Sequence, residues 1–155
     1  MRKDVTEDRA VVAEILQKAE YVTLALVDAD GPYGVPVSHA YENGVLYFHS
    51  SKVGRKADAV RLAVNSGGRV AFSAAIDLEP KTGDMACDWG CKFRCVLASG
   101  APRFVEGDAE KIAALNTLMR KYAGRDDFPY DPSILSRTAV IAVDVDRATA
   151  RLKLT

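Results

Sequence analysis

The sequence predicts a mainly β protein, an antiparallel β-barrel of six to seven strands with peripheral helices. Several short segments rich in β-branched and aromatic residues end at turn sequences such as Asn43-Gly44, which is typical of hairpins joined in series. Only two or three longer segments have apolar residues at helical spacing. With 155 residues, 48% of them hydrophobic, the chain can bury one core, so we expect a single domain over residues 1–155.

The first part of the chain predicts one helix followed by three strands. Apolar residues recur at helical spacing over residues 6–20, and residues 21–27, 33–41 and 45–49 are then dense in β-formers with turns between them. Pro36 lacks a backbone N–H donor. Its strand therefore belongs at a sheet edge, at a bulge, or where a ligand replaces the neighbouring strand.

The same criteria predict the elements of the remaining chain. We expect, in order, a helix over 55–65, a strand over 69–76, an irregular connection over 77–90, two strands within 92–105 bent at Gly100, a helix over 108–124, a short helical turn at Asp131-Pro132, and strands over 138–145 and 150–154. The connection has no clear period and holds Trp89, so we expect a mobile loop of the kind that often carries function.

The composition argues against two classes of partner. The 21 basic residues are matched by 21 acidic residues, so no overall field draws the chain to nucleic acid or to an anionic membrane. The sequence has no apolar run long enough to span a membrane, and the N-terminus Met1-Arg2-Lys3-Asp4 leads into an acidic helical pattern, which predicts a cytoplasmic protein.

The segment over 47–57 is the strongest candidate for a ligand site. It holds a strand end with His49, Ser50 and Ser51, then Gly54, and then Arg55 and Lys56 at a predicted helix start. Hydroxyl donors, free helix amides and positive charge in one place are what a phosphate monoester requires. A strand-to-helix loop with two solvated cations is the alternative that the local pattern leaves open.

Several weak motifs follow one another in a fixed order along most of the chain. They are Glu20 to Leu26, Gly34 to His39, Leu46 to Ser50, Gly54 to Ala57, Phe93 to Gly100, and Leu118 to Tyr122. In order and spacing they resemble the pyridoxamine-phosphate-oxidase superfamily, and within it the nitroimidazole-resistance branch. The resemblance implies a Greek-key split β-barrel that forms a homodimer, with one flavin mononucleotide (FMN) at each of two sites along the subunit interface.

The resemblance also assigns roles to individual residues. Arg55 and Lys56 match the phosphate-binding pair of the family. The other cofactor contacts that it implies are Val37 and Ser38 at the ring edge, His49, Ser50, Ser51 and Gly54 along the strand end and loop, and Arg94, Cys95 and Ser99 on a later strand. Cys87 and Trp89 are expected beside the substrate or the partner subunit.

The resemblance further implies an FMN-dependent oxidoreductase that reduces a small, electron-poor compound such as a nitroaromatic. Residues 148–155 do not resemble the segment with which pyridoxamine phosphate oxidases close over their substrate, so that activity is not expected. His49 is the candidate catalytic proton donor, with a substrate contact or simple packing as alternatives. A barrel that binds flavin, deazaflavin or haem without turnover is the second hypothesis, and a cofactor-free dimeric interaction module is the third.

The three cysteines carry two further predictions. The chain has an odd number of cysteines, Cys87, Cys91 and Cys95, and this argues against a secreted disulfide framework. Their spacing matches none of the usual zinc patterns, so we expect no metal site.

Overall fold

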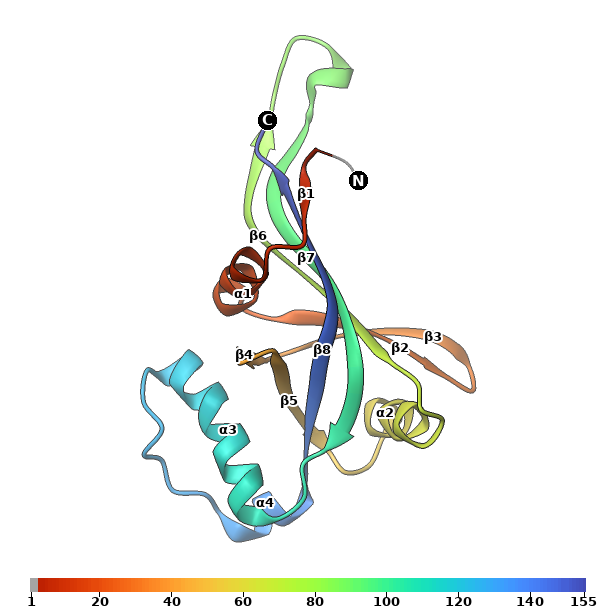
Figure 1. Cartoon of the computed structure of the whole chain (residues 1–155), viewed down its shortest axis with the longest axis vertical. Coiled ribbons are helices and arrows are strands. Elements are labelled where there is room, and N and C mark those ends of the chain that lie inside the picture. Colours follow the sequence, from red (N-terminus) through yellow and green to blue (C-terminus); the bar gives the residue numbers. More distant parts are fainter. Residues whose placement is uncertain (1–2) are drawn as a thin grey trace.

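The computed structural model describes residues 3–155 and contains one antiparallel sheet that curls into an open barrel (Figure 1). The strands are β1 (Val5–Thr6), β2 (Val22–Asp28), β3 (Gly31–Val37), β4 (Ala40–Glu42), β5 (Val45–Ser51), β6 (Val70–Lys81), β7 (Gly90–Phe104) and β8 (Thr138–Lys153). Seven are hydrogen-bonded in the order β3-β2-β6-β7-β8-β5-β4, and β1 pairs with β8. The predicted fold class is confirmed, with eight strands in the described residues rather than six or seven.

The two ends of the sheet, β3 and β4, are consecutive in the chain. The single strand expected over 33–41 is interrupted at Ser38 and His39, which link β3 to β4 and belong to neither strand. The pairing of β4 with β5 stops at Tyr47, so residues 48–51 of β5 have no strand on that side in the described chain. The barrel is therefore split, and Pro36 lies in β3 on one edge of the opening, where its missing donor breaks no ladder.

Strands β6 and β7 form a long hairpin that projects beyond the rest of the sheet (Figure 1). The prediction of an irregular connection over 77–90 is wrong at both ends, because β6 continues to Lys81 and β7 begins at Gly90. A bulge separates this arm from the barrel, with a register shift between Ile76 and Glu79 and a φ of 55° at Asp77. Only the tip is irregular, with one 3-10 turn at Ala86–Asp88.

Helices α1 (Arg9–Lys18), α2 (Arg55–Asn65), α3 (Asp108–Ala123) and α4 (Pro132–Arg137) lie around the sheet (Figure 1). Ile15 and Leu16 of α1 and Val60 of α2 are buried against the sheet, in one apolar core. This packing holds the start of α2 at the rim of the barrel, directly after the free end of β5.

Within residues 3–155, no helix combines the length and the apolar character needed to cross a membrane. Met1 and Arg2, which begin the charged N-terminus noted above, lie outside the described residues.

Candidate functional site

The start of α2 has no side chain that caps its backbone amides. The preceding Gly54 has a φ of 108° and a ψ of 167°, a conformation that residues with a side chain rarely adopt. The first intrahelical bond runs from the Asp58 N–H to the Gly54 carbonyl at 3.0 Å, so the N–H groups of residues 55–57 have no acceptor within the helix. These donors lie at the positive end of the helix dipole, which makes an anion their best ligand.

Lys56 adds a positive charge at this helix start. Its side chain is half-buried, and burial lowers the pKa of Lys56 below its usual value, with no acidic neighbour among the described residues to oppose the shift. A half-buried cation without a counter-charge costs free energy that an anionic ligand can offset. The same charge reaches β5, where desolvation first and Lys56 second lower the pKa of His49. The imidazole of His49 is therefore mainly neutral at pH 7.

Arg55 is held on the other side of the helix start by the β2–β3 hairpin. Its Nε–H donates to Asp28 Oδ2 at 2.5 Å, and its Nη2–H donates to Asp28 Oδ1 at 3.3 Å. The guanidinium also stacks over the ring of Tyr33, 4.3 Å from its centre. Sequence analysis missed Asp28 and Tyr33, because Asp28 precedes Arg55 by 27 residues and neither residue belongs to a recognisable motif.

Ser50 and Ser51 face opposite sides of β5, because successive strand residues alternate. Ser50 is buried, and its hydroxyl donates to the Ser51 carbonyl at 2.8 Å. Ser51 is exposed on the same face as His49, and its Oγ accepts the Val53 N–H at 3.3 Å, which leaves its hydroxyl hydrogen free to donate. Of the two serines, Ser51 is placed to donate to a ligand at the helix start.

Val37 and Ser38 lie where β3 ends at the opening of the barrel. Val37 is buried and pairs with Val22, so its side chain belongs to the core. Ser38 is exposed in the link between β3 and β4. Val37 therefore offers only its backbone to a ligand, whereas the side chain of Ser38 is accessible.

Two predicted contacts on β7 already have protein partners. Arg94 donates through Nε to Asp77 at 2.5 Å and through Nη1 to Glu14 at 3.1 Å, and only 18% of its side chain is exposed. It therefore joins α1 to the bulge of β6. Ser99 accepts a hydrogen bond from Arg69 at 3.2 Å.

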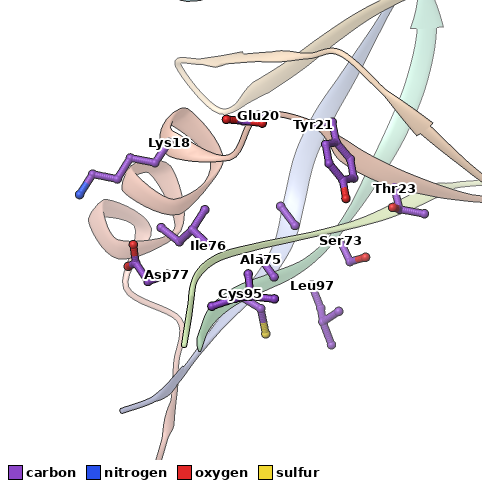
Figure 2. Close-up of a pocket in the computed structure, with 12 residues that line it drawn as sticks. Lys18, Glu20, Tyr21, Thr23, Ser73, Ala75, Ile76, Asp77, Cys95 and Leu97 are labelled. Atoms are coloured by element: carbon purple, nitrogen blue, oxygen red, sulfur yellow. The ribbon is translucent and has the colours of Figure 1, made fainter. Parts of the chain in front are cut away.

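Cys95 lines a cavity of about 740 Å³ on the outer face of the sheet. Figure 2 shows Lys18 and Asp77 beside α1 on one side of this cavity, and Tyr21, Thr23, Ser73 and Leu97 on the other. Burial raises the pKa of the Cys95 thiol, so Cys95 is protonated at neutral pH. Sequence analysis missed Leu97, although strand alternation from Cys95 places it on the same face.

Cys87 and Trp89 lie at the tip of the β6–β7 hairpin. Both are exposed, Trp89 by 61%. The Trp89 indole N–H donates to the Gly83 carbonyl at 2.9 Å and so fixes the form of the tip. Figure 1 shows this tip far from α2.

Among the predicted site residues, Val37 and Ser50 have buried side chains, and most of the others form two separate groups in one chain. The first group, called the α2 group here, consists of Ser38, His49, Ser51, Gly54, Arg55 and Lys56, around the split and the start of α2. The β7 group consists of Cys95 and Ser99 on the outer face of β7, whereas Arg94 lies on the opposite face of the strand and Cys87 and Trp89 lie at the hairpin tip. The free helix amides, the Ser51 hydroxyl and the two cations of the α2 group suit a phosphate monoester as ligand.

Comparison with known proteins identifies relatives of this fold. The family model described as pyridoxamine 5'-phosphate oxidase matches residues 8–152. A candidate 5-nitroimidazole antibiotic resistance protein from Bacteroides thetaiotaomicron is 27% identical in sequence, with a TM-score of 0.80 over 94% of this chain and 84% of that one. No curated protein matches the sequence closely enough to count as a relative.

Two more distant structures share the fold. A flavocytochrome from Azotobacter vinelandii is 17% identical with a TM-score of 0.85, covering 100% of this chain and 73% of that one. An FAD- and haem-binding protein from Mycobacterium smegmatis is 16% identical with a TM-score of 0.84, covering 99% of this chain and 75% of that one.

Proposed function

Because the chain belongs to the pyridoxamine 5'-phosphate oxidase family, we propose that it binds FMN and uses it to reduce a small, electron-poor compound of the nitroaromatic kind. Pyridoxamine phosphate itself is not the proposed substrate. Residues 148–153 pair with β7 as part of β8, so they are not free to close over a substrate.

The start of α2 is the observation that carries this proposal. It offers three backbone amides without intrahelical acceptors and the half-buried Lys56, which has no acidic neighbour in the described part of the chain. These groups would hold the phosphate of FMN together with Arg55 and the Ser51 hydroxyl. The adjoining opening between β3 and the end of β5 would take the flavin ring.

When bound, FMN supplies the electron transfer, and the residues of the chain place the cofactor and the substrate. We assign His49 as the residue that contacts the substrate at the ring. Its neutral imidazole can donate a hydrogen bond to an anionic oxygen that develops during reduction. The likeness in sequence and fold to a candidate 5-nitroimidazole resistance protein supports the choice of substrate class.

We also propose that two copies of the chain form the active unit. The outer face of β2, β6 and β7 carries small uncharged side chains in register, with Thr23 opposite Ser73 and Ser73 opposite Leu97. Leu97 is 61% exposed and the neighbouring Tyr21 is 58% exposed. A second copy covering this face would bring the Cys95 and Ser99 of its β7 group to the α2 group of the first copy, and the two groups would form one site.

The decisive experiment is anaerobic reduction and reoxidation of the purified protein with FMN. We expect a yellow protein whose flavin absorbance disappears with dithionite and returns when a 5-nitroimidazole is added. A protein that binds FMN but is not reoxidised supports the carrier or sensor function. Failure to bind FMN, with no thermal stabilisation by it, overturns the proposal.

The role of His49 has its own test. His49→Leu should lower the kcat of nitro reduction about 10²-fold, because leucine has no donor for the hydrogen bond formed in the transition state. The dissociation constant of FMN should change little. An equal loss in FMN affinity would instead make His49 a cofactor ligand.

A further inference from the structure

We propose that Asp28 and Tyr33, at the β2–β3 hairpin, position Arg55 so that its remaining N–H groups bind the cofactor phosphate. This inference rests on the proposed function and names two positioning residues within the same site. Neither residue was part of the site predicted from the sequence.

The pairing leaves Arg55 with donors to spare. A guanidinium has five N–H groups, and Asp28 accepts one from Nε and one from Nη2. The two N–H groups of Nη1 and the second of Nη2 are left for a ligand. These three donors lie in the guanidinium plane and suit the oxygens of a phosphate.

Asp28 is itself held firmly enough to position another residue. Only 14% of its side chain is exposed, whereas 47% of the Arg55 side chain is exposed. Asp28 Oδ1 also accepts the Asp30 N–H at 2.9 Å, which ties the carboxylate to the hairpin turn. The hydrogen bond from Arg55 holds the pKa of Asp28 below its usual value, so the carboxylate remains charged at neutral pH.

Tyr33 restrains the guanidinium in a second direction. Asp28 fixes the Nε and Nη2 edge, and the Tyr33 ring covers one face at 4.3 Å. Tyr33 pairs with Leu26 across the β2–β3 ladder, so its backbone is placed by the sheet. With an edge and a face held, the long Arg55 side chain loses its freedom on folding and not on ligand binding, which favours affinity.

The test compares FMN with riboflavin, which has the same ring and no phosphate. Asp28→Asn keeps the size and the acceptor oxygen of the side chain but removes its charge. We expect this variant to bind FMN about 10-fold more weakly and to bind riboflavin as the wild type does. Asp144→Asn is the matched control, because it removes an exposed carboxylate that pairs with Arg103 at 3.2 Å on other strands. This control should bind both flavins normally.

A double substitution separates positioning from direct binding. If Asp28 acts through Arg55, adding Asp28→Asn to Arg55→Ala should cause no further loss of FMN affinity. Tyr33→Phe should keep the ring contact and the wild-type affinity, and Tyr33→Leu should weaken FMN binding but not riboflavin binding.

The outcomes distinguish this inference from the proposed function. An unchanged FMN-to-riboflavin affinity ratio in Asp28→Asn overturns the inference. The inference is also overturned if Asp28→Asn lowers FMN affinity by the same factor in the wild type and in the Arg55→Ala variant. If Arg55→Ala binds FMN too weakly to measure, the FMN-to-riboflavin affinity ratio of the Asp28→Asn single variant decides whether the inference holds. A wild-type protein that binds neither flavin overturns the proposed function itself.

Discussion

Lys56 combines two unfavourable settings that a phosphate would relieve. It is a half-buried cation and it lies at the helix end where positive charge is disfavoured. Lys56→Met should therefore weaken FMN binding about 10-fold while leaving riboflavin binding intact. The unliganded variant should be as stable as the wild type or slightly more stable.

Isothermal titration with each flavin and thermal unfolding without flavin measure both effects. Lys81→Met, at an exposed position on the hairpin arm, is the control and should change neither quantity. Loss of stability in the unliganded Lys56 variant would show that the lysine is structural.

His39 belongs to a buried polar cluster that ties three parts of the chain together. It is fully buried, and its Nε2 lies 2.7 Å from the Leu16 carbonyl and 3.1 Å from Lys121 Nζ. Lys121 Nζ also donates to the Ala19 carbonyl at 2.6 Å. The His39 backbone N–H donates to the Tyr122 hydroxyl at 3.1 Å. The cluster joins the end of α1 to the end of α3 at the link between β3 and β4.

This cluster predicts acid-sensitive stability. Burial first, and the positive charge of Lys121 second, lower the pKa of His39 to about 4. The unfolded chain protonates this histidine near pH 6.5, so the unfolded state gains the proton first as pH falls. The contribution, at most about 3 kcal/mol, is complete above pH 6.5 and is lost between pH 6.5 and 4.

Urea unfolding at several pH values measures this loss. His39→Gln should give a shallower fall in the free energy of unfolding over that window. His49→Gln is the comparison, since the pKa of His49 is also lowered and accounts for part of the slope. A wild-type slope in the His39 variant would contradict the prediction.

At the scale of elements, the sequence predicts best where the signal is local. Residues 55–65 form α2 as expected, because a glycine start and apolar spacing suffice to define a helix. The Asn43-Gly44 turn joins β4 to β5 with φ values of 52° and 82°, which those two residue types tolerate.

Elements that depend on distant partners were predicted less well. The hairpin arm pairs Pro80 with Cys91 and Lys81 with Gly90, although these residues have little intrinsic strand preference. Strands β7 and β8 are each continuous where two strands were expected. The predicted bend at Gly100 is only a register shift in the ladder between them.

Gly100 is required by this close pairing of β7 with β8. A Cβ atom at Gly100 would overlap the backbone carbonyl of Asp144. Gly100→Ala should therefore lower the free energy of unfolding by about 1–3 kcal/mol, measured by chemical denaturation. Gly34→Ala is the control, because the nearest atom to its Cβ would be the Leu24 carbonyl oxygen at 4.0 Å. An equal change in the free energy of unfolding for the two substitutions would show that β7 and β8 move apart to accept the Cβ atom.

At the scale of the whole molecule, the sequence predicts the α2 group from a local motif but does not predict how it lies relative to the β7 group. Gly54, Arg55 and Lys56 are consecutive, so a local motif brings them together. Cys95 lies elsewhere in the chain, and in the proposed dimer it would reach the ligand from the second copy. Contacts between chains leave no periodic signal in a sequence.

The proposed dimer can be tested on its outer sheet face. Leu97→Arg would place a charge at the centre of that face and should convert a dimer into a monomer in sedimentation experiments. Leu62→Arg, at a 49% exposed position on α2, should leave the dimer intact. A wild-type protein that sediments as a monomer at micromolar concentration would contradict the proposed assembly.

The link at Ser38 and His39 limits how far the two edges of the sheet can separate. The two free edges of the sheet are joined there by covalent bonds, so any widening of the entrance must pivot on this short link. His39 is anchored to both α1 and α3. The link is therefore held against two helices, and the two edges cannot move apart there without breaking these contacts.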